Sequence, residues 1–246
     1  MKRRLLRIAN AAFKPFGVQL YKSGMDMDSV MRSMSARAVQ VRTVIDIGAS
    51  DGRWSRRAMR FFPQARFIAV EPLREREARL KALRDSDPRF DYALCVAGEK
   101  DEQIVELAVG ADLDGSTVGG SEGAVRQVPS RSIDAIAALK QCVGPFLLKF
   151  DTHGFEVPIL KGAARTLRDT HFIVMEVYNY RHTKGTLLFH EMCALLESSG
   201  FRCFNAADPM QRPLDGSLWQ MDLFFARHDN ELFRENSYQR PRSPTA

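Results

Sequence analysis

The chain has 246 residues, of which 45% are hydrophobic and 27% charged, a composition that excludes collagen-like, low-complexity and largely disordered proteins. That length suits one large α/β domain better than two independent domains. No uncharged apolar run approaches the roughly 20 residues that span a bilayer. Four widely separated cysteines, without a Cys-x-x-Cys pair, indicate neither a zinc site nor a disulfide framework, so we expect a soluble cytoplasmic protein.

Positive charge is concentrated at the N-terminus. The chain carries 36 Lys and Arg against 30 Asp and Glu, a net charge of +6. Residues 1–22 hold six basic residues and no acidic one, so the rest of the chain is neutral overall. A neutral body lacks the basic track that nucleic-acid binding requires, and we therefore predict no nucleic-acid partner.

Residues 1–40 are predicted to form a basic helical extension. Apolar residues recur at helical spacing with basic residues largely on the opposite face, and Pro15 and Gly17 end this first helix. The helix either packs on the domain edge or lies in the plane of an anionic membrane, so peripheral contact of residues 1–22 with the inner face of the membrane stays open. A second helix is predicted over residues 26–39.

Residues 41–228 alternate short apolar runs with helical patterns, which is typical of parallel βα units. Buried strands are predicted at residues 41–48, 65–71, 92–98, 146–151 and 172–177. Helices are predicted at residues 53–62, 74–84, 156–168 and 187–199.

The remaining segments are of other kinds. Residues 102–109 alternate like an antiparallel strand, and the Gly- and Ser-rich residues 114–123 predict a loop. Residues 201–205 and 218–226 predict a terminal hairpin. Residues 229–246 are polar and predict a disordered tail.

The first chemical motif follows the first predicted strand and begins a helix. It reads Asp46-Ile47-Gly48-Ala49-Ser50-Asp51-Gly52, in which the glycines let a ligand approach the backbone closely and the helix start offers unpaired N–H groups. The spacing matches neither the dinucleotide fingerprint nor a P-loop. About twenty residues later the second strand ends in Glu71, where an acid can accept both hydroxyls of a ribose. Together the two features predict an adenosine site.

Four segments carry a family resemblance: DIGASDG (46–52), VEP (70–72), LLKFDTHGFEVPILKGA (147–163) and FIVMEV (172–177). They resemble the FkbM methyltransferases, which are class I S-adenosylmethionine-dependent enzymes, and the resemblance extends from about residue 41 to 226. It implies an α/β, doubly wound, Rossmann-like sheet of seven strands whose last strand is antiparallel.

The same resemblance implies S-adenosylmethionine as cofactor. Its methionine end is expected beside Asp46, Gly48 and Gly52, with Ala49 and Ser50 in the same turn. Glu71 is expected to hold the ribose, and Ala97 to lie near the adenine.

The acceptor is expected beside Asp151, which ends a buried strand at the carboxyl edge of the sheet. An alcohol is a poor nucleophile, so O-methylation benefits from a base, and both Asp151 and His153 are candidates. An imidazole titrates near neutral pH, which suits a base, but many relatives carry Glu in place of His153. The assignment of the base therefore stays open between the two.

Glu176 ends the next strand. It is interpreted either as a buried carboxylate paired with Lys149 or as an active-site carboxylate opposite Asp151. Asp151, His153 and Glu176 form an ordinary ligand set for a divalent cation. Such clusters often remain metal-free, so we predict no metal. The loop at 114–123, with its hydroxyl side chains, is expected to fold over the site.

The sequence therefore predicts methyl transfer from S-adenosylmethionine to a hydroxyl of a sugar, a glycan or another small-molecule or polyketide-like acceptor. Two alternatives belong to other classes. One is a cofactor-binding interaction protein without catalysis, which the unusual His153 suggests. The other is an NAD-dependent oxidoreductase, which the missing third glycine of the dinucleotide fingerprint disfavours.

Overall fold

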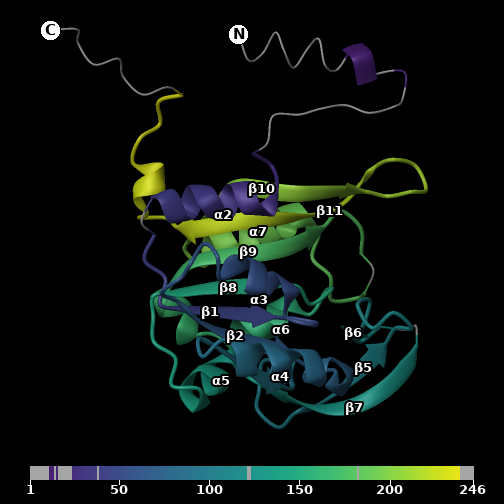
Figure 1. The fold of residues 1–246 in the computed structure, drawn as a ribbon. Coiled ribbons are helices and arrows are strands. Elements are labelled where there is room, and N and C mark those ends of the chain that lie inside the picture. The colour runs from purple at the N-terminus through teal and green to yellow at the C-terminus, as the bar shows by residue number, and fades with distance from the viewer. Residues whose placement is uncertain are drawn as a thin grey trace, which may run out of the picture.

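The computed structural model describes residues 11–13, 15, 24–37, 39–120, 123–181 and 183–238. Most of the predicted basic helix over residues 1–22, His182 and residues 239–246 lie outside this part. Among the described residues, no helix has the length and apolar character needed to cross a membrane. Figure 1 shows a twisted central sheet with helices on both faces and a smaller sheet to one side.

Within the described residues, seven strands form the central sheet in the order β10-β11-β9-β8-β1-β2-β3. They are β10 (Phe201–Gln211), β11 (Leu218–Arg227), β9 (Thr170–Tyr178), β8 (Phe146–Phe150), β1 (Thr43–Ile47), β2 (Arg66–Glu71) and β3 (Phe90–Leu94). β1 pairs in parallel with both β2 and β8, whereas β11 runs antiparallel to both β9 and β10. The predicted sheet with its antiparallel last strand and the predicted terminal hairpin are therefore confirmed.

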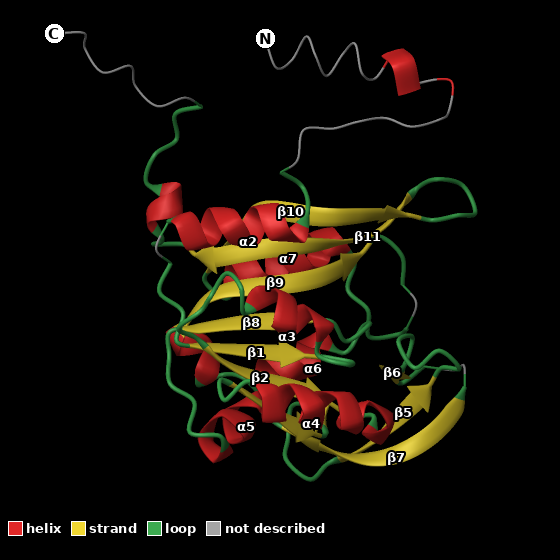
Figure 2. Cartoon of the chain, in the orientation of Figure 1, coloured by secondary structure: helices red, strands yellow, loops and turns green. Residues whose placement is uncertain are grey.

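Alternating side chains of the central strands supply two apolar layers, because successive residues of a strand point to opposite faces. One layer packs against α2 (Met27–Ala36), α3 (Arg53–Ala58) and α4 (Glu77–Ser86). The other packs against α5 (Ile133–Leu139), α6 (Glu156–Lys161) and α7 (Phe189–Ser198). Figure 2 shows this arrangement of helices on either side of the sheet.

Four further strands of the described chain form a second sheet in the order β4-β7-β5-β6. They are β4 (Val96–Ala97), β7 (Ala124–Arg131), β5 (Ile104–Val109) and β6 (Thr117–Val118). This corrects three predictions. The strand expected over 92–98 divides at Cys95 into β3, which pairs with β2, and β4, which pairs with β7. Strand β6 lies within the residues that were expected to form a loop. Neither strand β7 nor helix α5 was predicted from the sequence.

Several helices are shorter than the hydrophobic pattern predicts. The helix expected over 156–168 ends as α6 at Lys161, and a separate 3₁₀ turn, η3, covers Thr166–Asp169. A Cβ atom on Gly162 would lie 2.0 Å from the carbonyl oxygen of Gly98, so the two backbones touch at this point. The helix expected over 74–84 begins with the 3₁₀ turn η2 (Arg74–Arg76), and the one expected over 53–62 ends at Ala58.

A segment near each end of the described chain, α2 and the turn η4 (Glu231–Phe233), packs on the domain. In α2, Met27, Val30, Met31 and Met34 are buried in the core layer, so this part of the predicted extension belongs to the domain. The 3₁₀ turn η4 (Glu231–Phe233) falls in the predicted tail, yet Phe233 packs against the core and carries the Arg202 guanidinium 4.7 Å above its ring. Order therefore extends several residues beyond the point where the sequence predicts that it ends.

Candidate active site

A pocket of about 580 Å³, open to solvent, lies at the carboxyl ends of β1, β2 and β8 and is also lined by the segment that carries β6. Its position is where open α/β sheets bind ligands. The predicted site residues that line it are Gly48, Ser50, Glu71, Ala97, Asp151 and His153.

Gly48 brings the loops that follow β1 and β8 together. Its backbone has φ +78°, and a Cβ atom here would lie 1.8 Å from the carbonyl oxygen of Asp151. The N–H of Asp151 donates to the carbonyl of Ile47 over 2.9 Å. Only glycine tolerates both the conformation and the contact, so the predicted adenosine loop directly adjoins the predicted acceptor residue.

Glu71 is fixed at the pocket wall by backbone donors. Its two carboxylate oxygens accept the N–H groups of Ser50 at 2.8 Å and Leu73 at 2.9 Å. The residue is only 4% exposed, and burial raises the pKa of Glu71 to about 7 although these two donors and nearby Arg76 act to lower it. The carboxyl group therefore has one orientation before any ligand arrives.

Three of the residues predicted to bind the cofactor lie behind the pocket wall and do not line the pocket. The carboxylate of Asp46 accepts the Ser55 hydroxyl at 2.7 Å, and burial raises the pKa of Asp46 to about 6. Ala49 packs in the core layer, and Gly52 begins α3 with φ +77°, where a Cβ atom would lie 3.1 Å from Leu83. These residues shape the turn, and the structure does not place them against the pocket.

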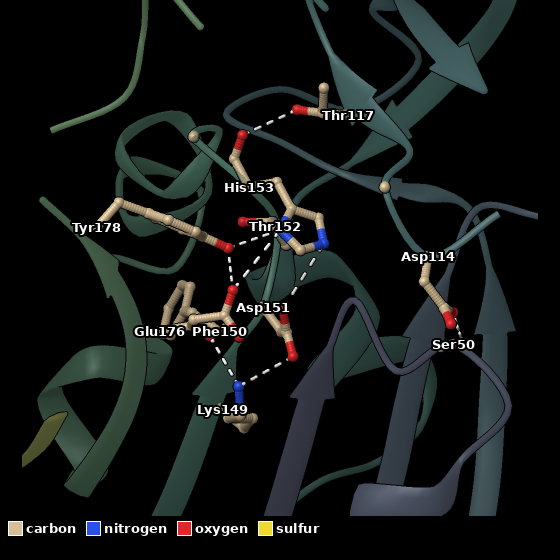
Figure 3. A network of polar contacts seen from close by, with 12 residues as sticks. Ser50, Asp114, Thr117, Lys149, Phe150, Asp151, Thr152, His153, Glu176 and Tyr178 are labelled. Carbon is tan, nitrogen blue, oxygen red and sulfur yellow. Dashed lines mark hydrogen bonds and ion pairs between the residues drawn. The ribbon is translucent and has the colours of Figure 1, made fainter. Parts of the chain in front are cut away.

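The segment over the pocket is held by polar contacts with residues below it. Asp114 accepts the Ser50 hydroxyl at 2.9 Å and also the guanidinium of Arg76. On the other side, the Thr117 hydroxyl donates to the backbone carbonyl of His153 over 2.9 Å (Figure 3). The predicted loop therefore does lie over the site, although part of it is strand β6.

Lys149 forms a buried charged centre beneath the acceptor side. Its side chain is 2% exposed, and Nζ donates to Asp151 Oδ2 over 3.2 Å and lies 3.3 Å from Asp222 Oδ1. Burial alone would lower the pKa of Lys149, but the surrounding carboxylates raise it above its ordinary value. Burial likewise opposes ionisation of Asp151, but Lys149 and His153 hold its pKa below the usual range. Asp151 is therefore ionised at neutral pH.

His153, Tyr178 and Glu176 form a chain beside Asp151 (Figure 3). The Tyr178 hydroxyl lies 2.6 Å from Nδ1 of His153 and donates to Oε1 of Glu176. On the other edge of the ring, Nε2 lies 3.8 Å from Asp151 Oδ1. Burial, reinforced by the Asp151 charge, raises the pKa of Glu176 to about 8. Tyr178 was missed from the sequence, although its spacing of two from Glu176 on one strand places both side chains on one face.

Asp151, His153 and Glu176 each offer a ligand atom within 4.8 Å of the others, so the set has the composition to hold a divalent cation. The Lys149 ammonium already stands 3.2 Å from Asp151. It balances the Asp151 charge without an ion, and we assign no metal here.

Residues 46–203 match the family described as the methyltransferase FkbM domain. The chain belongs to this family. It is therefore an S-adenosylmethionine-dependent methyltransferase, as the resemblance predicted, and the interpretation as an NAD-dependent oxidoreductase is set aside. No curated protein matches the chain by sequence.

Several solved methyltransferases are similar to this chain at low identity. The O-methyltransferase TomG from Streptomyces achromogenes, in complex with S-adenosylmethionine, is 16% identical over 90% of this chain and 89% of its own, with a TM-score of 0.48. The 1,6-didemethyltoxoflavin-N1-methyltransferase of Burkholderia thailandensis is 14% identical over 82% and 80%, with a TM-score of 0.45. A precorrin-6y C5,15-methyltransferase from Geobacter metallireducens is 11% identical over 85% and 93%, with a TM-score of 0.41.

Proposed function

We propose that this methyltransferase modifies a hydroxyl oxygen of a sugar, a glycan or another small-molecule or polyketide-like acceptor. The observation that supports an oxygen acceptor is the pair of Asp151 and His153 at the pocket wall, directly beside Gly48. Their side chains are 33% and 27% exposed, so both are accessible from the pocket. A hydroxyl becomes a good nucleophile when a positioned base removes its proton, and this pair offers such a base.

The pocket residues fit S-adenosylmethionine. Glu71, oriented by two backbone donors, would accept the ribose hydroxyls, and Ala97 would lie beside the adenine. Gly48 and Ser50 would face the methionine end, where the missing Cβ of Gly48 leaves room for close approach. When bound, the cofactor supplies an electrophilic methyl group on a positively charged sulfur.

The chain's own contribution is alignment and proton removal. Lys149 holds one oxygen of Asp151, and Tyr178 holds one edge of the His153 ring, so both acceptor-side groups have fixed orientations. A proton taken by His153 would create an imidazolium 3.8 Å from the Asp151 carboxylate, and the opposite charges would stabilise each other.

Cofactor binding can be tested by calorimetric titration with S-adenosylmethionine and S-adenosylhomocysteine. Replacing Glu71 by Ala removes charged hydrogen bonds to the ribose, so affinity should fall by roughly 1.5–3 kcal/mol, about tenfold to over a hundredfold. Glu75→Ala is the matched control, because Glu75 is an exposed carboxylate paired with Arg126. Wild-type protein that is folded but binds neither compound would contradict the proposed site.

Acceptor chemistry can be tested with methyl-labelled S-adenosylmethionine and a panel of sugars, other alcohols, amines and RNA. We expect label in methyl ethers, and we expect Asp151→Asn and His153→Gln to slow transfer without abolishing cofactor binding. Transfer to amines or RNA alone would refute an oxygen acceptor. Tight cofactor binding with no transfer to any acceptor would favour the cofactor-binding interaction protein instead.

A further inference from the structure

Tyr178 is a buried residue that connects two acceptor-side groups. It is 4% exposed, ends β9, and its hydroxyl contacts both Nδ1 of His153 and Oε1 of Glu176. Figure 3 shows the phenol pointing between the imidazole and the carboxyl group. The His153 ring thus meets Tyr178 along one edge and Asp151 along the other.

The number of available hydrogens fixes which group donates at each of these two contacts. A tyrosine hydroxyl has one hydrogen, and a neutral imidazole carries one N–H. An ionised Glu176 can only accept, so above its pKa of about 8 the Tyr178 hydrogen goes to Glu176 and the phenol oxygen accepts at the 2.6 Å contact with His153. Nδ1 must then be the protonated nitrogen, and Nε2 carries the lone pair.

We propose that Tyr178 is a positioning residue that selects the Nδ1–H tautomer of His153, with Glu176 as the terminal acceptor of the chain. The inference rests on the proposed function for its catalytic meaning. It favours His153 over Asp151 as the base, because Nε2 is then the basic atom on the edge that faces Asp151. In a catalytic triad, a carboxyl group holds an imidazole in the tautomer that can accept a proton. Here a phenol lies between the carboxyl group and the imidazole.

Other contacts keep the ring in place for this role. The backbone of His153 has φ +53°, a conformation that few non-glycine residues adopt, and Thr117 donates to its carbonyl. Asp151 lies 3.8 Å from Nε2, beyond hydrogen-bond length, so it does not compete with Tyr178 for the choice of tautomer. It is near enough to stabilise the imidazolium once Nε2 has taken a proton.

The groups around Glu176 come from three neighbouring elements. Lys149 and Asp151 belong to β8 and its end, Asp222 faces Glu176 across the β9–β11 pair, and Glu156 begins α6. The proposed chain requires only that Oε1 act as an acceptor. Replacement by Gln, which keeps an acceptor oxygen, therefore separates the acceptor role of Glu176 from its charge.

The tautomer can be read directly by long-range ¹H–¹⁵N spectra of protein labelled with ¹⁵N-histidine, recorded above about pH 8, where Glu176 is ionised. The chain has five histidines, and His153→Gln assigns the resonance of interest. Wild type should show a protonated Nδ1 and an unprotonated Nε2. Tyr178→Phe should move both ¹⁵N shifts toward the Nε2–H form, and Glu176→Ala should do the same while Glu176→Gln retains the wild-type pattern.

Tyr180→Phe is the matched control, because its hydroxyl lies 2.6 Å from that of Ser217 and should leave the His153 shifts unchanged. A wild-type spectrum with Nε2–H, or shifts that do not respond to Tyr178→Phe and Glu176→Ala, would overturn the proposal. If one of these two variants fails to fold, the other still decides. The spectra need neither cofactor nor acceptor, so a failed proposed function would not be confused with a failed tautomer assignment.

With an active acceptor, Tyr178→Phe should lower kcat with little change in the KM for S-adenosylmethionine. A purely structural role would change both values or the thermal midpoint instead.

Discussion

Replacing Lys149 by Met would leave two partly buried carboxylates, those of Asp151 and Asp222, without their cation. The methionine stem has a similar length and is apolar, so the change removes charge with little change in volume. In the wild type, Nζ lies 3.2 Å from Asp151, 3.3 Å from Asp222 and 3.2 Å from the carbonyl of Phe150. All three contacts vanish together in the variant.

The magnitude follows from these distances. At an effective dielectric constant of about 20, each charge pair contributes about 5 kcal/mol of attraction. Desolvation of the ammonium and the two carboxylates opposes much of this gain. Removing Lys149 leaves uncompensated, partly buried charges, so we expect Lys149→Met to lower the free energy of unfolding by up to about 3–5 kcal/mol at neutral pH, the range for a fully buried pair.

The sign of the pH dependence can be worked out. Without Lys149, the pKa of Asp151 in the folded protein rises above its unfolded value, and the pKa of Asp222, which burial already raises, rises further. The variant therefore loses stability as the pH rises through the carboxylate range, and its deficit relative to wild type should shrink in acid. Adding Asp222→Asn to Lys149→Met removes one orphaned charge and should restore part of the loss.

Urea unfolding at neutral and acidic pH measures both effects. Lys161→Met is the control, because Lys161 is 61% exposed and its contact with Glu99 is long, so its loss should change stability by less than about 1 kcal/mol. If Lys149→Met is no more destabilised than Lys161→Met, the charged centre around Lys149 does not have the energetic role assigned here.

Three further predictions concern the same site. Gly48→Ala should lower the free energy of unfolding by at least about 1–3 kcal/mol more than Gly216→Ala, measured in urea, because Gly216 has a similar positive φ but nothing near its Cβ position. The free energy of unfolding of Glu176→Gln should rise relative to that of wild type as the pH rises from about 4.5 to 8. The reason is that a raised carboxyl pKa makes wild type lose stability over that range. A difference between the two proteins that does not change with pH would contradict this. Asp114→Ala should speed S-adenosylmethionine dissociation roughly fivefold in stopped-flow measurements, since it frees the segment over the pocket from Ser50; an unchanged rate would show that the contact does not retain the cofactor.

The central sheet was predictable because its strands are nearly continuous apolar runs. β1, β2, β8 and β9 are buried on both faces, and such strands are recognisable from their composition alone. β7 was missed because it is mostly exposed and contains Pro129, a residue that argues against a strand. The division at Cys95 was missed because the apolar run continues across it, and only pairing with the distant β7 separates the two strands.

The site was predictable to the extent that it lies at strand ends. Glu71 and Asp151 were identified because each follows an apolar run at the edge where such sheets bind ligands, and both line the pocket. Asp46 lies one residue before the end of β1, and its side chain is buried against Ser55 behind the loop. A motif identifies the turn, but a difference of one or two residues decides which side chains reach the ligand.

The charged centre depends on register, which a single sequence does not reveal. Asp222 reaches Lys149 because β11 places it opposite Glu176, while β8 places Lys149 opposite Val174, two residues earlier on the same face of β9. One step of slippage in either pairing would turn Asp222 to the opposite face and leave Lys149 with a different partner. Charged residues inside otherwise apolar strands do indicate that buried partners exist. Which partners they are follows only from how the strands align.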